Sequence, residues 1–168
     1  RVGVGWCGSR GGAKRAMGTV GDSADVSRIF ANTNAAAAGG ASAALILTQV
    51  VYGKVDLTMV LNGALAGLVS ITAEPLTPTL GAATLIGAVG GLIVVFSVPL
   101  VDKFQIDDVV GAIPVHLIAG VWGTLAVPLT NSDASFGTQI VSIFIVGAFT
   151  FVASAVVWFI IKAVVGIR

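Results

Sequence analysis

Five long apolar stretches, separated by short polar breaks, run through this chain of 168 residues. A helix needs about 20 mostly apolar residues to cross the roughly 30 Å hydrocarbon core of a bilayer. The stretches occupy residues 29–52, 57–73, 81–100, 109–129 and 138–165. None shows the alternation of apolar and polar residues that is typical of outer-membrane β-strands, so helices are favoured over a barrel. We therefore expect an all-α integral membrane protein, a bundle of about five transmembrane helices.

Composition excludes several classes of protein. Hydrophobic residues make up 56% of the chain and charged residues 10%, with a mean hydropathy of +1.00. Soluble domains carry about 25% charged residues, so a soluble enzyme is not expected. The net charge of +1 and the lack of a basic cluster with interleaved aromatic residues exclude nucleic acid as a partner. The single Cys7 allows no internal disulfide, and we expect no metal site and no cofactor.

Helix packing is also predictable. Small residues recur at four-residue spacing in Gly63-x3-Gly67 and Gly87-x3-Gly91, a pattern that favours close helix contacts. The stretch at 57–73 is short and predicts a helix that ends inside protein rather than in lipid. The last stretch would measure about 42 Å as a helix, which is longer than the hydrocarbon core is thick. We expect it to tilt or project, with its aromatic side chains facing lipid.

The distribution of basic residues predicts the orientation. Under the five-span arrangement Lys54, Lys103, Lys162 and Arg168 fall on one side of the membrane, and the loops on the other side carry no Lys or Arg. The positive-inside rule places the C-terminus in the cytoplasm of a multi-pass cell-membrane protein. Five of the nine basic residues, however, lie in residues 1–28, on the opposite side. We interpret this as an atypical segment that precedes a membrane domain at 29–168.

His116 is the candidate functional residue. Within the last four stretches it is the only ionisable side chain near a bilayer centre. Such groups are costly in lipid and usually face a bundle interior or a pore. A neutral imidazole donates at one nitrogen and accepts at the other, which suits a proton relay or a site for a small polar solute. The alternative is a packing hydrogen bond to a neighbouring helix.

Three residues near His116 are expected to support its helix. Pro114 removes one backbone amide and can open the helix locally. Asp107 and Asp108 immediately precede the span, and either can cap its N-terminus and interact favourably with the helix dipole.

The stretch Asp107-Asp108-Val-Val-Gly-Ala-Ile-Pro-Val-His116 and the residues after it resemble the tenth membrane helix of the ammonium transporter (Amt/Mep/Rh) family. Residues 62–72 resemble the eighth helix, and residues 27–34 resemble the start of the seventh. Family members have eleven helices, with the C-terminus in the cytoplasm, and form trimers with one pore per subunit. The resemblance implies that this chain is a C-terminal half fragment that supplies helices 7 to 11.

The resemblance also implies a mechanism. His116 matches the second histidine of a twin-histidine pair in a narrow hydrophobic pore for ammonium or ammonia. Ala112, one turn earlier, would line the pore, and Asp107 or Asp108 would hold the cytoplasmic end of the helix. The implied partners are ammonium or its analogue methylammonium, membrane lipid, further copies of the chain in a homotrimer, and a cytoplasmic PII-type regulator. The first histidine belongs to the fifth helix, so the chain alone is expected to be inactive.

The first residues depart from the family pattern after Gly5-Trp6. The gate phenylalanine of the family would fall at Ser9, and its recruiting serine would fall near Ala13. We expect residues 1–28 to be a remnant of the sixth helix and outer loop, altered by a frameshift or sequencing error upstream of about Met17. Two alternative functions are a structural membrane protein without a transport site and a haem-binding electron carrier, although the chain has no second histidine to ligate haem.

Overall fold

The computed structural model describes residues 19–166, and all of the secondary structure over that range is helical. Its elements are α2 (Val20–Tyr52), α3 (Leu57–Ser70), α4 (Leu80–Lys103), the π-helical segment η1 (Ile113–Ile118), α5 (Ala119–Thr130) and α6 (Phe136–Val165). Four spans are long and apolar enough to cross a membrane: α2, α4, η1 continued by α5, and α6. The prediction of an all-α membrane bundle is therefore confirmed.

Helix α3 is shorter than each of the four membrane-length spans. It has 14 residues, so it is about 21 Å long and does not by itself match the thickness of a hydrocarbon core. It packs against α2, α4 and α5, and residues 66–71 at its C-terminal end are all buried. The prediction that this helix ends inside protein is thus confirmed, and of the five expected spans four have full membrane length.

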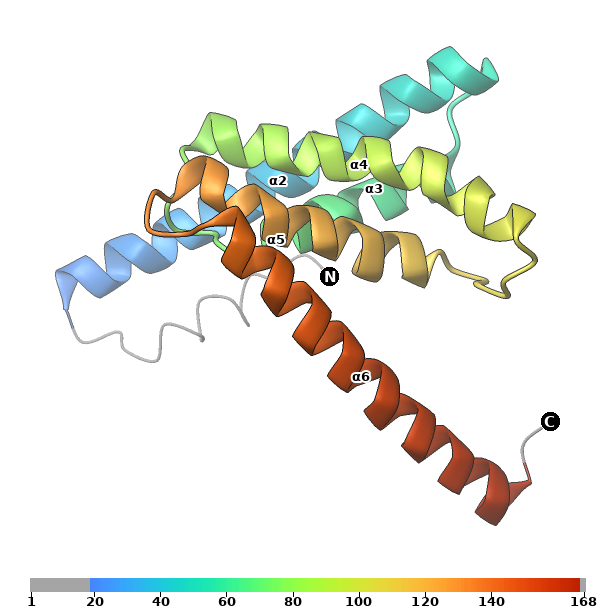
Figure 1. Ribbon diagram of the computed structural model, residues 1–168. Helices are drawn as coiled ribbons and strands as arrows, with labels where there is room; N and C mark the ends of the chain where they lie inside the picture. Colours follow the sequence, from blue (N-terminus) through green and yellow to red (C-terminus); the bar gives the residue numbers. More distant parts are fainter. Residues whose placement is uncertain (1–18, 167–168) are drawn as a thin grey trace.

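The N-terminal end of α2 lies further upstream than the apolar pattern predicts. The helix begins at Val20 rather than at residue 29, because Thr19 and Asp22 form a capping box. The Thr19 hydroxyl accepts a 3.1 Å hydrogen bond from the Asp22 amide, and the Asp22 carboxylate accepts a 3.3 Å bond from the Thr19 amide. Residues 20–28 are therefore the first turns of α2, and this end extends beyond the neighbouring helices (Figure 1).

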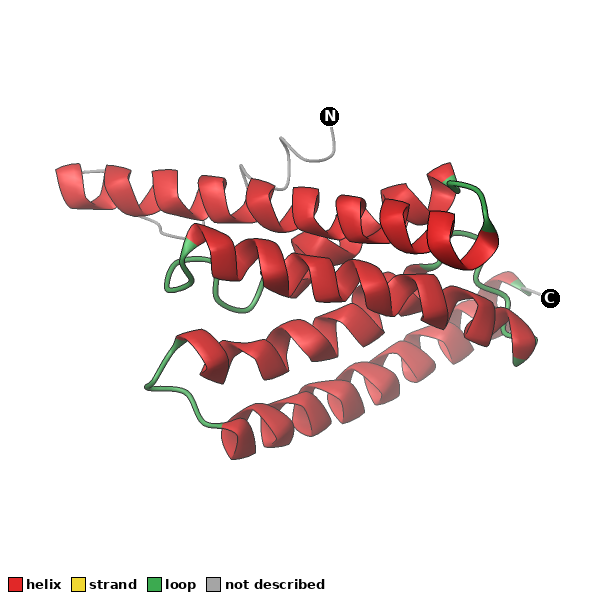
Figure 2. Ribbon diagram, turned by 90° about the horizontal axis from the view of Figure 1, so that it is seen from above, coloured by secondary structure: helices red, strands yellow, loops and turns green. Residues whose placement is uncertain are grey.

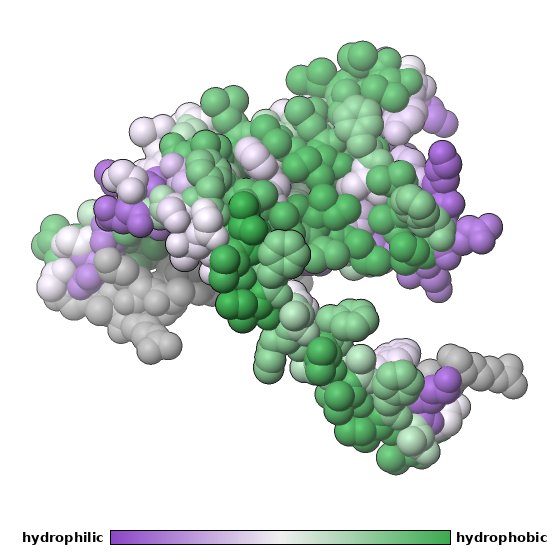
Figure 3. All heavy atoms as spheres, viewed as in Figure 1, coloured by the Kyte–Doolittle hydropathy of each residue, from purple (hydrophilic) through white to green (hydrophobic). Residues whose placement is uncertain are grey.

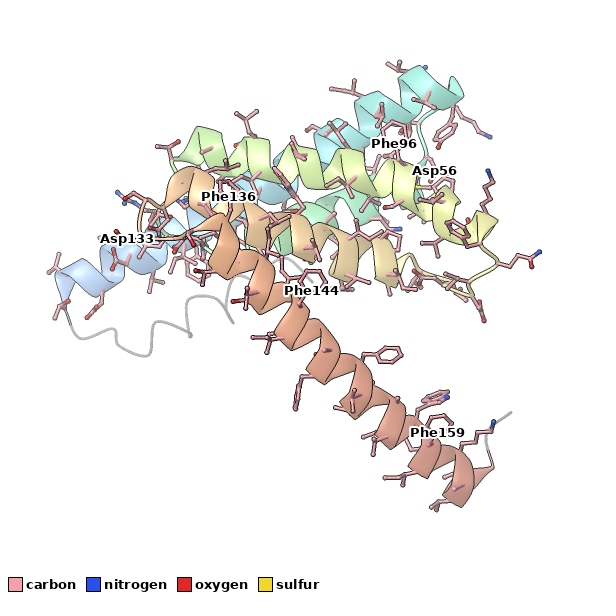
Figure 4. The ribbon with its side chains drawn as sticks, in the orientation of Figure 1. Asp56, Phe96, Asp133, Phe136, Phe144 and Phe159 are labelled. Atoms are coloured by element: carbon pink, nitrogen blue, oxygen red, sulfur yellow. The ribbon has the colours of Figure 1, made fainter. Side chains whose placement is uncertain are left out.

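Successive helices run in alternating directions, so the connections gather at two ends of the bundle (Figures 1 and 2). Asp56, between α2 and α3, lies at one end, and Asp133, between α5 and α6, lies at the other (Figure 4). Hydrophilic residues concentrate at these ends, and a mainly apolar surface lies between them (Figure 3). This distribution suits a protein whose middle contacts lipid and whose ends contact water.

Glycine contacts bring α2, α3 and α4 close together. A Cβ atom at Gly40 would collide with the carbonyl oxygen of Gly63, and one at Gly91 would collide with the carbonyl oxygen of Gly40. A Cβ atom at Gly87 would likewise collide with the carbonyl oxygen of Ala36. Only glycine allows these backbones to approach so closely, so the packing predicted from the small-residue spacing is confirmed.

Helix α6 leaves the bundle diagonally (Figure 1). It has 30 residues, none of them buried. Phe144 is 72% exposed and Phe159 is 68% exposed, and both project from the helix in Figure 4. At about 45 Å the helix exceeds the thickness of a hydrocarbon core. The predicted long, outer helix is therefore present.

Candidate functional site

His116 lies in η1 and is exposed, although the segment around it is apolar. Its side chain lines a cavity of about 710 Å³. The walls come from the C-terminal end of α3 and its following turn, from η1 and α5, and from α6. The lining residues are Val69, Thr72, Ala73, His116, Leu117, Gly120, Val121, Thr124, Ser142, Ile143, Val146, Gly147, Thr150 and Phe151.

The chemistry of this cavity is largely aliphatic, with a few hydroxyl groups and one imidazole. The Thr72 hydroxyl donates a 2.8 Å hydrogen bond to the Leu68 carbonyl, and the Thr124 hydroxyl donates a 2.9 Å bond to the Gly120 carbonyl. Within residues 19–166, His116 makes no recorded hydrogen bond or ion pair. The structure therefore gives no support to a packing hydrogen bond, and both ring nitrogens can interact with a solute.

The helix that carries His116 starts with an unusual cap. One carboxylate oxygen of Asp108 accepts a 2.7 Å hydrogen bond from the Ala112 amide, and the other accepts a 2.8 Å bond from the Ile113 amide. Gly111 has a φ of 74° and its amide donates to the Asp108 carbonyl, a conformation that glycine adopts without strain. Asp108 thus satisfies two of the amides that a helix N-terminus leaves without partners.

Two other predicted residues lie elsewhere. Both side-chain cap bonds go to Asp108 and none goes to Asp107, which is exposed. Both carboxylates line a second cavity of about 240 Å³, together with Asn62 and Asp102. Ala112 is also exposed, at the position before η1, and it is not among the residues that line the His116 cavity. The structure thus brings neither residue to the His116 cavity.

Pro114, two residues before His116, is fully buried on the packed side of the segment. The segment that contains it is π-helical, and the Ala119 amide donates to the Pro114 carbonyl, five residues earlier. The family positions assigned to Ser9 and Ala13 lie outside the described residues.

Several lining residues could not be assigned to the site from sequence. Ser142 and Thr150 on α6 line the His116 cavity, but hydroxyl residues within a long apolar helix carry no distinguishing pattern. Asn62 is 7% exposed and lines the second cavity, but a single amide side chain in an apolar stretch carries no pattern that marks a site. Within residues 19–166 no group of three or more His, Cys, Asp or Glu side chains is arranged to hold a metal ion.

Sequence comparison relates the chain to one protein family. Residues 3–168 match the profile of the Ammonium Transporter Family. The chain is 35% identical over 164 residues to the ammonium transporter Amt2 of Archaeoglobus fulgidus, with 85% of this chain and 35% of that protein covered. It is 31% identical over 168 residues to the ammonium transporter Amt2 of Methanocaldococcus jannaschii, with 98% and 37% covered. The chain therefore spans about a third of the length of these relatives.

Solved structures show the same arrangement of helices. A Sensor Amt Protein superposes with a TM-score of 0.85 and 27% identity, covering 96% of this chain and 42% of that one. Mep2 of Candida albicans superposes with a TM-score of 0.82 and 23% identity, covering 96% and 39%. The second likeness concerns the fold alone. Together with the profile match and the relatives above 30% identity, these comparisons show that the chain belongs to the ammonium transporter family.

Proposed function

We propose that this chain forms part of a transporter that carries ammonium or ammonia across the cell membrane, and that His116 is the second histidine of its pore. One observation supports this most directly. His116 lines an apolar cavity of about 710 Å³ and makes no recorded hydrogen bond within residues 19–166. A polar side chain of this kind in a membrane-spanning segment is expected to serve a solute rather than the fold.

The physical reason lies in the cost of moving ammonium through an apolar passage. Burying an isolated cation in such surroundings is strongly unfavourable, so the proton and the neutral ammonia are more easily handled separately. An imidazole can accept a hydrogen bond from ammonia at one nitrogen and donate one at the other. The wall around His116 is largely aliphatic, with a few hydroxyl groups, so it offers ammonia few other hydrogen-bond partners.

The twin-histidine site requires a partner histidine from outside these 168 residues, since the chain contains one. We therefore expect the chain to be inactive alone and the longer protein to be active.

We propose that the longer protein is a homotrimer and that its partners are ammonium and a cytoplasmic PII-type regulator. The end of the bundle that carries Lys54 and Lys103 faces the cytoplasm in this proposal. Lipid surrounds the outer surface of the protein. The protein catalyses no covalent reaction.

The test is uptake of labelled methylammonium by cells that express the longer natural protein with His116→Ala. We expect uptake to be abolished, or its selectivity changed, at unchanged abundance in the membrane. Ser154→Ala is the matched control, because it removes a hydroxyl from α6 at an exposed position that does not line the cavity, and it should retain uptake. Normal uptake and selectivity in His116→Ala would overturn the pore role.

The orientation has its own experiment. A cysteine introduced at Lys162 should react with a membrane-impermeant maleimide only when the cytoplasmic face is accessible, in a background without other cysteines. A cysteine at Asp133, at the opposite end of the bundle (Figure 4), should react only from outside. The reverse pattern would refute the proposed orientation.

A further inference from the structure

We propose that Pro114 is a positioning residue for His116. It holds residues 113–118 in a π-helical turn, and this turn keeps the imidazole at the cavity instead of against the neighbouring helices. The functional importance of this placement rests on the proposed function of His116, whereas the placement itself can be measured independently of transport.

The burial pattern carries the first step. Pro114 and Val115 are both fully buried, His116 is exposed, and the next fully buried residue is Ala119. An α-helix turns about 100° per residue, and a π-helix turns less because each hydrogen bond spans one more residue. Slower turning lets two consecutive residues, Pro114 and Val115, share the face that Ala119 also occupies. The observed bond from the Ala119 amide to the Pro114 carbonyl has this five-residue span.

An α-helical turn would place His116 differently. With α5 held where it is, tighter winding between residues 113 and 118 would rotate Pro114 off the buried face and rotate His116 towards that face. The imidazole would then turn away from the cavity and towards the buried residues packed with Val115, which include Ala66 and Val94. The π-helical turn is therefore what exposes His116 at this point of the chain.

Pro114 opposes the α-helical alternative in two ways. It has no amide hydrogen, and its ring would crowd the carbonyl four residues earlier, so an α-helix cannot extend upstream through this position without cost. The two preceding amides, those of Ala112 and Ile113, already donate to the Asp108 carboxylate, and the Val115 amide donates to the Gly111 carbonyl at 3.1 Å. Each backbone donor at the entrance of the turn is therefore satisfied or absent.

Restoring the amide should release this arrangement. In Pro114→Ala the ring that crowds the preceding turn is gone and position 114 regains an amide donor, so residues 113–118 are freer to wind as an α-helix. The same substitution removes a buried ring that fills the packed face. Pro128→Ala is the matched control, because Pro128 lies inside α5 of the same span and outside the π-helical turn.

The experiment measures how fast Ag⁺ reacts with a cysteine that replaces His116, in the longer natural protein without other cysteines. The thiol that remains unreacted is quantified by alkylation in denaturant and mass spectrometry. Pro114→Ala should slow the reaction about tenfold, a population shift of about 1.4 kcal/mol, while Pro128→Ala leaves it unchanged. An unchanged rate in Pro114→Ala overturns the positioning role.

A second variant keeps the test decisive if Pro114→Ala does not accumulate in the membrane. Asp108→Ala removes the carboxylate that accepts from the Ala112 and Ile113 amides at the start of the turn. It should also slow the Ag⁺ reaction, whereas Asp107→Ala should not. Equal rates in these two variants overturn the proposal.

Where His116 is retained, Pro114→Ala should lower the maximal rate of methylammonium uptake more than it changes KM. Normal uptake in His116→Ala, with the expected Ag⁺ pattern, would refute the pore role and leave the positioning intact.

Discussion

The indole of Trp122 on α5 donates a 3.0 Å hydrogen bond from Nε1 to the backbone carbonyl of Ile86 on α4. The ring also packs against a buried cluster that includes Ile86, Ala36 and Ile71. This contact fixes the face of α5 that turns away from the His116 cavity. The hydrogen bond to α4 on one side of α5 therefore also helps to fix the position of Val121 and Thr124, which line the cavity on its other side.

Replacing Trp122 with Phe should destabilise the protein by the worth of one interhelical hydrogen bond, about 0.6 kcal/mol on average in membrane proteins, plus a packing term. Thermal unfolding in detergent, followed by near-ultraviolet circular dichroism, would measure this. The control is Trp158→Phe on α6, where the indole is 58% exposed. Equal shifts of the two melting temperatures would contradict the role given to Trp122.

Asn32 joins α2 to the connection between α3 and α4. Its side-chain amide donates to the carbonyl of Pro75 at 2.9 Å and to that of Pro78 at 2.8 Å, and its side chain is 2% exposed. Asn32→Ala leaves two carbonyls without these donors, at a cost of about 1–3 kcal/mol for a buried group. Hydrogen exchange over residues 71–79 should accelerate. Asn34→Ala, which loses a bond only within its own helix, should leave exchange there unchanged.

The helices and the candidate residue His116 could be predicted from the sequence, whereas the start of α2 could not. Apolar run length is enough to predict helices, because lipid demands long unbroken helices whatever their neighbours. His116 is conspicuous because an ionisable group in such a helix has few ordinary explanations. The start of α2 at Val20 was not predicted, since the capping box of Thr19 and Asp22 lies outside the apolar run that defined the span.

Other parts of the site depend on contacts between distant residues. Ser142 and Thr150 join the His116 cavity only because α6 crosses η1 and α5 at this point, and no local pattern encodes that crossing. The selection between Asp107 and Asp108 depends on the left-handed conformation of Gly111, which brings the Asp108 carboxylate back to the amides of Ala112 and Ile113.

Gly87 provides a test of close packing between α4 and α2. A Cβ atom there would collide with the Ala36 carbonyl and Cα atoms, so Gly87→Ala should destabilise the protein by about 1–3 kcal/mol through overpacking. Gly147→Ala on α6 is the control, because a Cβ there meets no atom within 4 Å and Ala favours a helix. Loss of stability in the control and none in Gly87→Ala, measured by thermal unfolding, would reject this account.

Glu74 holds together two connections at the end of the bundle that carries Asp133. One carboxylate oxygen accepts hydrogen bonds from the amides of Leu76 and Thr77 at 3.3 and 3.4 Å, and the other accepts a 3.3 Å bond from the Asn131 side-chain amide. Glu74→Ala should accelerate hydrogen exchange at Leu76 and Thr77 and loosen the residues around Asn131. Each hydrogen bond to a charged group is worth about 1.5–3 kcal/mol.

Glu74→Gln separates these two effects, because its single carbonyl oxygen can still accept from Leu76 and Thr77 while its amide nitrogen cannot accept from Asn131. Exchange at Leu76 and Thr77 should therefore stay slow in Glu74→Gln, and only the region around Asn131 should become faster. Mass spectrometry of exchanged peptides measures both regions in one experiment. Fast exchange at Leu76 and Thr77 in both variants would show that the negative charge of Glu74, rather than its acceptor geometry, organises this end of the bundle.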